Sequence, residues 1–434
     1  MDGGEMRLPS FTLHRLPTLA DHLGGGDRPA AAIPNPIARH PLYHPSPSFF
    51  ISDNDVAFDP SGVRAAIVTC GGLCPGTNTV VRELVVGLWE LYGVRAVFGV
   101  RNGYHGFYSE GEEPLPLEPA TVRHWHKAGG TALGASRGGF DLARIVDGIE
   151  RRGFNQVYAV GGDGTMRGLV EILREARRRG LAVAVAGVPK TVDNDVGVID
   201  RSFGFHTAVD EAQRAIAAAH VEAESAANGV GLVKLMGRSA GHIALHATLS
   251  SRDVDCCLIP EEDLYLRGPG GLFEFLYRRL KRNGHVVVVV AEGAGQRLIP
   301  RPTCGEQRRD ESGNPAFLDV GAWLKAELRA WWAEEHAGEP LTVKYIDPTY
   351  MIRAPVLHAA GALGDPRRHG RVPGFVPGPI NGNYGYIPVD EVAEARNPVD
   401  TRDHKWAWVR SVTNQPDFAQ STEDKALAGL YKAV

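Results

Sequence analysis

The sequence predicts an α/β protein built from two doubly wound, Rossmann-like lobes, with the functional site in the cleft between them. Short apolar runs alternate with segments whose apolar residues recur at helical spacing, a rhythm typical of parallel sheets covered by helices. Glycine-rich turns follow several of these apolar runs directly, as they do where open α/β sheets bind ligands. At 434 residues, the chain is also too long for one simple core.

The composition narrows the class of protein and its partners. The chain is 43% hydrophobic and 23% charged, which is ordinary for a globular protein. Its net charge of −4 argues against nucleic acid or an anionic membrane as the main partner. No apolar segment is long enough to span a bilayer, and the N-terminus lacks a signal-peptide pattern. The five cysteines are odd in number and lack zinc-type spacing, so we predict reduced thiols and a cytoplasmic location.

The chain divides by pattern into an extension and two lobes. Residues 1–60 are rich in Pro, His and Ser without periodicity, which predicts an extension. Residues 61–205 are predicted to form the first lobe, completed by about 355–405. Residues 206–354 are predicted to form the second lobe, completed by about 406–434.

The expected elements follow in order. In the first lobe, strands are predicted over 63–69, 95–100, 157–160 and 181–188, with helices after Gly76 and over 142–152. In the second lobe, we predict an alanine-rich helix over 206–227, strands over 231–235, 256–259, 286–290 and 341–346, and helices beginning near Gly271 and Pro315. Prolines and glycines from Pro355 to Pro379 predict no clean element, and order resumes over 384–389.

The stretch from Val157 to Asp195 is the predicted centre of the site. One apolar run ends in the turn Gly-Gly-Asp-Gly-Thr (161–165), and the next ends in Pro-Lys-Thr-Val-Asp-Asn-Asp (189–195). Two parallel strands side by side would bring a glycine turn and three carboxylates to one edge of a sheet. This combination predicts phosphoryl transfer.

Two glycine turns are candidates for phosphate binding. Gly71 to Gly76 lies between a strand and a helix, where backbone N–H groups can approach a phosphate, although a tight turn without ligand is an equal alternative. In the second turn, Gly162 and Gly164 can admit a nucleotide, Asp163 can hold Mg²⁺ and Thr165 can donate to a phosphate. The alternative for the second turn is a plain glycine turn.

Thr191, Asp193 and Asp195 alternate along a segment that is expected to be extended, so their side chains would point the same way. Clustered carboxylates raise one another's pKa, and one of them can accept a hydroxyl proton during phosphoryl transfer. A helix cap is the alternative interpretation.

Basic residues at expected loop and strand ends suit anionic substrates. Arg137 could neutralise charge on a transferring phosphoryl group, or it could be a surface arginine. Arg238, Arg353 and Lys344 lie where a sugar phosphate could be bound. Glu292 could accept hydrogen bonds from sugar hydroxyls, or it could be an acidic residue at a helix N-terminus.

Taken together, these motifs resemble the 6-phosphofructokinase family over roughly residues 60–355 and again near 381–417. The matching segments are Gly-Gly-Leu-Cys-Pro-Gly (71–76), Gly-Gly-Asp-Gly-Thr (161–165), Pro-Lys-Thr-Val-Asp-Asn-Asp (189–195), Met-Gly-Arg (236–238), Ala-Glu-Gly-Ala-Gly-Gln (291–296) and Tyr-Met-Ile-Arg (350–353). The N-terminal extension and Tyr-Ile-Asp-Pro-Thr-Tyr (345–350) are similar to the plant and kinetoplastid branch.

The resemblance implies the phosphofructokinase fold and a role for each matching residue. Asp193 would be the base that activates the sugar 1-hydroxyl, Thr191 and Asp195 would assist it, Asp163 would bind Mg²⁺, and Gly72 with Arg137 would stabilise the γ-phosphoryl group. The implied nucleotide contacts are Gly71, Gly72, Arg137, Gly138, Gly162, Asp163, Gly164 and Thr165. The implied fructose 6-phosphate contacts are Thr191, Val192, Asp193, Met236, Gly237, Arg238, Glu292, Lys344, Tyr350, Met351, Ile352 and Arg353, with Lys344 able to reach from a neighbouring subunit. The resemblance further implies an allosteric glycolytic enzyme that assembles as a homodimer or homotetramer.

Two residues bear on the phosphoryl donor. Pyrophosphate-dependent members usually have Asp at the position of Gly164, where a carboxylate would collide with the ATP α-phosphate. They also carry Lys at the position of Lys190, as this chain does. ATP is favoured because the effect at Gly164 is steric.

Two alternatives stay open: a pyrophosphate-dependent fructose 6-phosphate 1-phosphotransferase, and a non-catalytic nucleotide- or sugar-phosphate-binding subunit. The second arises because the Pro- and Arg-rich segment 355–379 departs from the family, which normally continues there with two helices.

Overall fold

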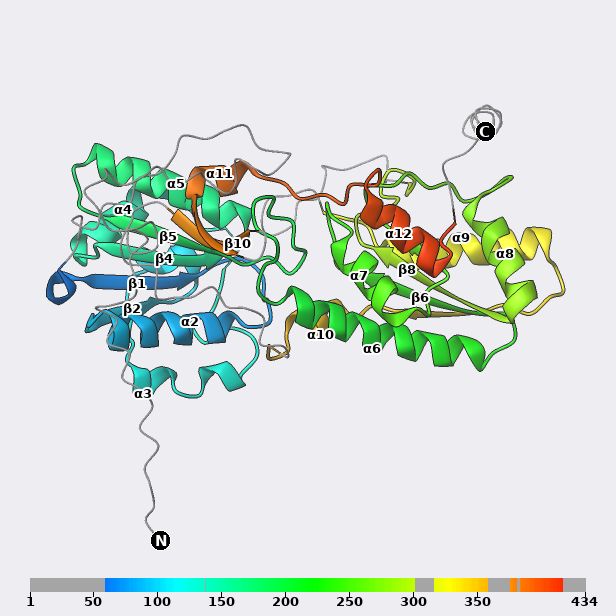
Figure 1. The fold of residues 1–434 in the computed structure, drawn as a ribbon, viewed down its shortest axis with the longest axis horizontal. Helices are drawn as coiled ribbons and strands as arrows, with labels where there is room; N and C mark the ends of the chain where they lie inside the picture. Colours follow the sequence, from blue (N-terminus) through cyan, green and yellow to red (C-terminus); the bar gives the residue numbers. More distant parts are fainter. Residues whose placement is uncertain (1–58, 137, 301–315, 358–374, 381–382, 417–434) are drawn as a thin grey trace, which may run out of the picture.

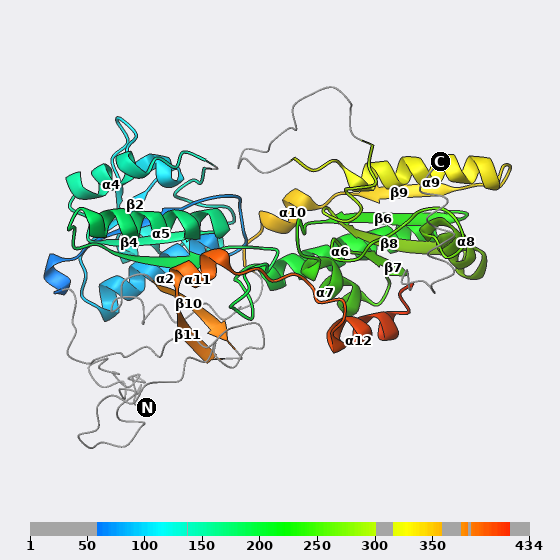
Figure 2. The same ribbon diagram turned by 90° about the horizontal axis from the view of Figure 1, so that it is seen from above.

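The computed structural model describes residues 59–136, 138–300, 316–357, 375–380 and 383–416. The predicted extension, Arg137, most of the unusual segment 355–379 and the last residues of the chain lie outside these ranges. Figures 1 and 2 show two lobes side by side, each with a central sheet covered by helices.

The first lobe contains a seven-stranded sheet in the order β11-β10-β5-β4-β1-β2-β3. Its strands are β1 (Arg64–Thr69), β2 (Ala96–Val100), β3 (Leu115–Pro116), β4 (Gln156–Gly161), β5 (Ala184–Pro189), β10 (Phe375–Ile380) and β11 (Asn383–Pro388). The five inner strands pair in parallel, and the two edge strands, β3 and β11, pair antiparallel. The carboxyl ends of β1, β4 and β5 therefore lie at the same edge of the sheet.

Helices cover both faces of this sheet (Figure 1). They are α2 (Thr77–Val86), continued by a π-helical turn at Gly87–Leu91, α3 (Pro119–Val122), α4 (Leu142–Arg151), α5 (Asp163–Arg178) and α11 (Val389–Glu394), with 3₁₀ turns at Pro60–Gly62, Gly103–Phe107 and Trp125–Lys127. In β4, Val157 and Ala159 pack with α4 and α5, whereas Tyr158 and Val160 pack with α2. This alternation places the two cores on opposite faces of the sheet.

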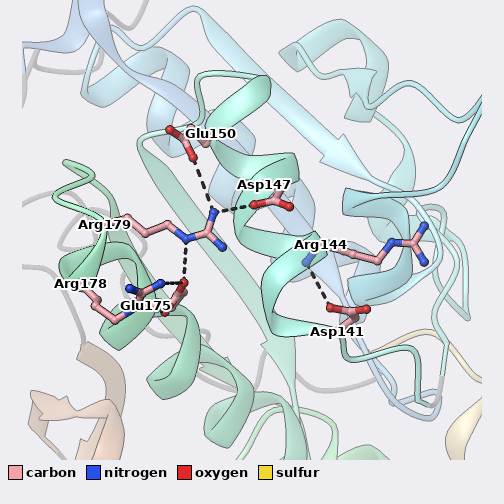
Figure 3. Close-up of polar contacts among 7 residues, drawn as sticks. All are labelled: Asp141, Arg144, Asp147, Glu150, Glu175, Arg178 and Arg179. Carbon is pink, nitrogen blue, oxygen red and sulfur yellow. Dashed lines mark hydrogen bonds and ion pairs between the residues drawn. The ribbon is translucent and has the colours of Figure 1, made fainter.

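The arginine-rich end of α5 is joined to α4 (Figure 3). Arg179 contacts Asp147 at 2.5 Å and Glu175 at 2.7 Å, and Arg178 contacts Glu175 at 2.7 Å. Exposed ion pairs of this kind contribute little individually, but together they orient the C-terminal end of α5. The Gly-Gly-Asp-Gly-Thr turn (161–165) lies at the opposite end of the same helix.

The second lobe contains a four-stranded parallel sheet in the order β7-β8-β6-β9. Its strands are β6 (Gly229–Leu235), β7 (Cys256–Leu258), β8 (His285–Ala291) and β9 (Thr342–Ile346), and its helices are α6 (Phe205–Glu224), α7 (His242–Ser251), α8 (Leu272–Asn283), α9 (Val320–Glu335), α10 (Thr349–Arg353) and α12 (His404–Thr413). One core joins α6, α7, α10 and α12 to the sheet, and another joins α8 and α9 to it. Both lobes are thus covered on two faces, as the sequence predicts.

The chain returns to each lobe near its end. β10, β11 and α11 belong to the first lobe, and residues 395–403 then cross to α12, which packs in the second lobe (Figure 1).

The prediction of no clean element up to Pro379 is wrong at its C-terminal end. We predicted no element up to Pro379, yet β10 begins at Phe375 and contains Pro377 and Pro379. Proline cannot donate to a ladder, but β10 pairs with β5 only at Phe375, and its partner on the other side is the edge strand β11. The backbone N–H groups that Pro377 and Pro379 lack are therefore not needed for pairing with β5.

Candidate active site

The turn after β4 presents Asp163 at the start of α5. Gly162 precedes the helix, and Asp163 is its first residue. Burial raises the pKa of Asp163, and the charge of Asp195 raises it further, while Arg396 and Arg167 oppose the shift. The side chain remains 19% exposed, and its Oδ2 lies 3.6 Å from Arg396 Nη1. The carboxylate thus lies at a positive helix end with access to solvent.

The glycines of this turn differ in what surrounds them. A Cβ atom added to Gly164 would meet nothing within 4 Å, and one on Gly162 would meet only the Lys190 carbonyl at 3.5 Å. A Cβ on Gly161 would instead lie 2.1 Å from Thr165 Oγ1. Gly161 is therefore needed for packing, whereas Gly162 and Gly164 leave open space beside the helix start.

Thr165 faces the protein interior rather than this space. It is buried, its side chain packs on Gly161, and its hydroxyl group hydrogen-bonds the buried Cys70 thiol. Its backbone N–H donates to Gly162 O at 2.9 Å. Both donors of Thr165 are thus engaged within the protein.

The first glycine turn is joined to the end of β5 by Lys190. Gly71 and Gly76 have positive φ angles of 81° and 94°, which favour glycine. The Lys190 ammonium group is buried and donates to the Gly72 carbonyl, while Lys190 N–H donates to Gly161 O at 2.8 Å. Lys190 therefore contacts both glycine turns. Gly138, which follows the undescribed Arg137, also has a positive φ of 79°.

The carboxylate segment after β5 is a turn, so the predicted extended geometry is wrong. Val192 and Asp193 form the turn, and Asn194 has a left-handed φ of 58°. Thr191 Oγ1 donates to Asp195 Oδ1 at 2.5 Å. The structure brings the three predicted polar residues together, but it does so by folding the chain back rather than by strand alternation. Val192 itself is buried in the second-lobe core.

The carboxyl group of Asp193 has a strongly raised pKa. Burial raises its pKa well above the usual range, and the nearby charges of Asp195 and Glu292 raise it further. The backbone N–H and the charge of Arg238 oppose this shift. Among the described residues, Asp193 Oδ1 is buried without a hydrogen-bond partner. Such an atom is suited to a donor supplied by a ligand.

The second lobe meets Asp193 with the ends of β6 and β8. Gly237 has a φ of 130°, and a Cβ there would lie 2.6 Å from the Ala240 carbonyl. The Glu292 N–H donates to Leu235 O, and the Gly293 N–H donates to Gly237 O, so the two strand ends are joined. Burial raises the pKa of Glu292, opposed by the charges of Arg238 and Lys234. Met236, which precedes Gly237, packs at the edge of the second-lobe core.

The predicted sugar-phosphate residues of α10 and β9 have different surroundings. Ile352 is fully buried in the core, whereas Tyr350 and Met351 are 73% and 68% exposed. Arg353 stacks its guanidinium 4.9 Å from the Tyr350 ring, and its buried Nε has no partner within the described chain. Lys344 forms an ion pair with Glu222 of α6 at 2.8 Å. Lys344 is thus engaged on the outside of its own lobe.

Two residues near the site were missed by the sequence analysis. Arg396 approaches Asp163, and Asn397 hydrogen-bonds the backbone of Asn194 and Asp195. Neither belongs to a recognisable motif, and about 200 residues separate them from their partners. The only signal was a polar Arg-Asn-Pro segment between two helical patterns.

Comparison with known proteins gives the family. The phosphofructokinase family model matches residues 64–351, which is well over half of the sequence. The chain belongs to the phosphofructokinase family. It is 61% identical over 420 residues to "ATP-dependent 6-phosphofructokinase 2" of Arabidopsis thaliana, covering 88% of this chain and 94% of that one. It is 38% identical to "ATP-dependent 6-phosphofructokinase" of Trypanosoma brucei brucei, covering 87% and 78%. The resemblance to the phosphofructokinase family, including its plant-like branch, is confirmed.

Solved phosphofructokinase structures share the fold. The pyrophosphate-dependent phosphofructokinase of Marinobacter aquaeolei matches with a TM-score of 0.63 and 19% identity, covering 81% of this chain and 91% of that one. A phosphofructokinase structure from Saccharomyces cerevisiae matches with a TM-score of 0.58 and 21% identity, covering 81% and 47%. At these identities the comparison concerns the fold alone, and it confirms the predicted phosphofructokinase architecture.

Proposed function

We propose that this phosphofructokinase transfers the γ-phosphoryl group of ATP to the 1-hydroxyl group of D-fructose 6-phosphate, yielding fructose 1,6-bisphosphate and ADP in glycolysis. The observation that carries the proposal is the buried Oδ1 of Asp193 at the junction of the lobes, which has no hydrogen-bond partner among the described residues. Two relatives that are 61% and 52% identical to this chain are named "ATP-dependent 6-phosphofructokinase 2" and "ATP-dependent 6-phosphofructokinase 1".

Asp193 acts as the general base. As the 1-hydroxyl oxygen bonds to the γ-phosphorus and the bond from that phosphorus to the β,γ-bridging oxygen breaks, the hydroxyl proton passes to Asp193. A base with a raised pKa holds this proton more readily than an ordinary aspartate. Thr191 holds Asp195 in place through its hydroxyl group, and the charge of Asp195 helps to keep the pKa of Asp193 high.

The first lobe binds the nucleotide in this proposal. Gly71, Gly72 and Gly138 offer backbone groups to the phosphates, Arg137 adds positive charge, and the space beside Gly162 and Gly164 accommodates the nucleotide.

Asp163 would hold Mg²⁺. Among residues that the structure describes, no group of three or more His, Cys, Asp or Glu could enclose a metal ion. Mg²⁺, however, is commonly held by one or two carboxylates together with substrate phosphates. Asp163 fits this pattern because it is a hard oxygen donor, partly exposed, beside the open space at Gly164. When bound, the ion neutralises charge on the phosphates.

The second lobe binds the sugar phosphate. Glu292 accepts hydrogen bonds from sugar hydroxyls, while Met236, Gly237 and Arg238 border the sugar opposite Asp193. Arg353 contributes charge for the 6-phosphate, with Tyr350 stacked against it.

We further propose that the enzyme is a homo-oligomer in which Lys344 serves a neighbouring subunit. The exposed Tyr350 and Met351, close to the predicted substrate residues, support such an interface. Light scattering on the purified chain tests this, and a monomer at working concentrations would contradict it.

The donor is tested by measuring fructose 1,6-bisphosphate formation with ATP and with pyrophosphate in parallel. We expect turnover with ATP, because the space at Gly164 is open and the Lys190 ammonium group is bonded to the Gly72 carbonyl. Turnover with pyrophosphate alone would favour the alternative phosphotransferase. Absence of turnover with either donor would favour a non-catalytic binding subunit.

We further propose that the enzyme is located in the cytoplasm. The described residues form no helix long and apolar enough to cross a membrane. Two related Arabidopsis thaliana enzymes are named chloroplastic. Imaging a fluorescent fusion that retains the native N-terminus tests the location, and plastid fluorescence would contradict the proposal.

A further inference from the structure

We propose that Asn397 is a positioning residue that holds the turn 191–195 in its catalytic geometry and couples it to the second lobe. The inference rests on the proposed phosphoryl transfer. Asn397 belongs to the segment Arg396–Val399, which we call the strap, on the crossing between α11 and α12 (Figure 1). None of the residues that the sequence motifs single out lies in the strap.

Asn397 binds two consecutive carbonyl groups of the turn. Its side-chain Nδ2 donates to Asn194 O at 2.8 Å, and its backbone N–H donates to Asp195 O at 3.0 Å. These two contacts fix the orientation of successive peptide groups, and therefore the directions in which the Asp193 and Asp195 side chains leave the backbone.

The turn needs such support because its backbone is unfavourable. Asn194 has a φ of 58°, a region that residues other than glycine enter at a cost. On its other side, Asn194 Oδ1 accepts from Ser202 N–H at 2.8 Å, and Nδ2 donates to Asp200 O at 3.2 Å. Asn194 is thus held by its own side chain on one side and by Asn397 on the other.

The strap is also hydrogen-bonded to the second lobe. His242, the first residue of α7, has its Nε2 2.8 Å from Asn397 O. Because a carbonyl can only accept, the ring carries a proton on Nε2. Two residues further on, the Val399 N–H donates to Glu261 Oε1 at 2.6 Å, and the same carboxylate accepts from the Gly241 N–H. Asn397 therefore contacts the catalytic turn and the second lobe at once.

The fit between strap and turn is close. A Cβ added to Gly197, just after the turn, would lie 2.4 Å from the Arg396 carbonyl. The ion pair of Arg396 with Asp163 is weaker support, because its atoms are 3.6 Å apart and the Arg396 side chain is 63% exposed. The hydrogen bonds of Asn397, rather than this ion pair, therefore determine how the strap holds the turn.

The first experiment replaces Asn397 with alanine, which removes Nδ2 and keeps the backbone N–H. Small misplacements of catalytic groups cost about 10²-fold in rate, so we expect kcat to fall about 10- to 100-fold. The KM values for ATP and fructose 6-phosphate should stay within about threefold, because no substrate contact is removed. A kcat within twofold of the wild type would overturn the proposal.

Asn155→Ala is the matched control. Asn155 also joins two backbone segments, through Nδ2 to Gly62 O at 2.8 Å and Oδ1 to the Arg64 N–H at 2.8 Å, but it lies at the opposite ends of the strands. We expect this variant to lose thermal stability and keep kcat. If the two variants lost kcat in equal proportion to their stability, Asn397 would be merely structural.

The link to the second lobe is tested at His242. Leucine removes the donor, whereas glutamine offers an amide N–H in a similar place, so His242→Leu should lower kcat several-fold and His242→Gln should restore most of it. Equal kcat in both variants would overturn the coupling to the second lobe.

Hydrogen exchange tests the positioning role of Asn397 independently of enzyme turnover. Amides of residues 190–195 should exchange at least tenfold faster in Asn397→Ala than in the wild type or in Asn155→Ala. If the wild type transferred no phosphoryl group, the proposed function would fail, while the exchange measurement would still report on the strap. Unchanged exchange in Asn397→Ala would overturn the positioning role regardless of turnover.

Discussion

The turns that follow β4 and β5 carry the same chemical group in different surroundings. Asp163 is partly exposed at a helix start, with Arg396 and Arg167 nearby. Asp193 has a buried oxygen without a partner in the described structure, and the charges of Asp195 and Glu292 raise its pKa further than burial does alone. Neighbouring parallel strands bring the two carboxylates to one sheet edge, but their surroundings separate the roles of metal ligand and base.

The two turns also differ in how tightly they are held. Around Gly164 there is open space, whereas Asn194 and Asp195 are hydrogen-bonded to Ser202 and Asn397 on opposite sides. The first arrangement leaves room for a ligand, and the second holds a reactive group in place. One sheet edge thus supplies both an open binding site and a rigid one.

The largest expected effect is at the rigid turn. Asp193→Asn removes the base and nearly preserves shape, so kcat should fall about 10²- to 10⁴-fold with little change in KM. Steady-state kinetics with ATP and fructose 6-phosphate measure this. Retention of more than a tenth of the wild-type kcat would show that the two aspartates do not differ in role as proposed.

Gly164→Asp tests the open turn. A carboxylate there would lie near the phosphates of ATP, and the juxtaposition of like charges costs several kcal/mol, so kcat/KM for ATP should fall about 10²-fold. The fold should be unaffected, because a Cβ at this position meets nothing within 4 Å. Gly164→Ala, which adds volume without charge, is the control and should stay within about tenfold of the wild type. Equal losses in the two variants would indicate a steric or helix effect instead.

Lys190→Met removes the side-chain link between the two glycine turns. It leaves the Gly72 carbonyl without its lysine donor, which should cost about 1–3 kcal/mol in unfolding free energy. The preference for ATP over pyrophosphate should persist. Denaturant unfolding measures the first effect, with Lys281→Met as the exposed control, for which about 0.5 kcal/mol or less is expected. A switch of donor preference would show that Lys190 selects the donor.

The smallest expected effect is a pH shift in Asp195→Asn. The charge of Asp195 disfavours ionised Asp193 and so raises its pKa. Asp193 must be ionised to accept a proton, so kcat falls as pH falls through that pKa. Removing the Asp195 charge lowers the pKa, and the acid limb of the pH profile of kcat should move to lower pH. An unmoved limb would mean that another group governs it.

Some features of the site could be predicted because they are local. The apolar run from Val157 to Val160 predicted a strand, which the structure buries on both faces. Asp163 was expected at a helix start because a glycine turn precedes an amphipathic pattern there. The geometry of residues 191–195 could not be obtained in this way. Strand alternation predicts an extended segment, whereas hydrogen bonds from Ser202 and Asn397 favour a turn with Asn194 in the left-handed region.

The fold class, the glycine turns and the chemical groups that reach one sheet edge could all be predicted from the amino-acid sequence. Hydrophobic period, glycine and charge are properties of neighbouring residues, so they can be read along the chain. Three features became visible only in the folded molecule: which carboxylate is buried, that Lys190 bonds to Gly72, and that Asn397 supports a turn 203 residues away from it. Burial and hydrogen-bond partners depend on which distant segments the fold brings together, and the spacing of residues along a chain carries no record of that.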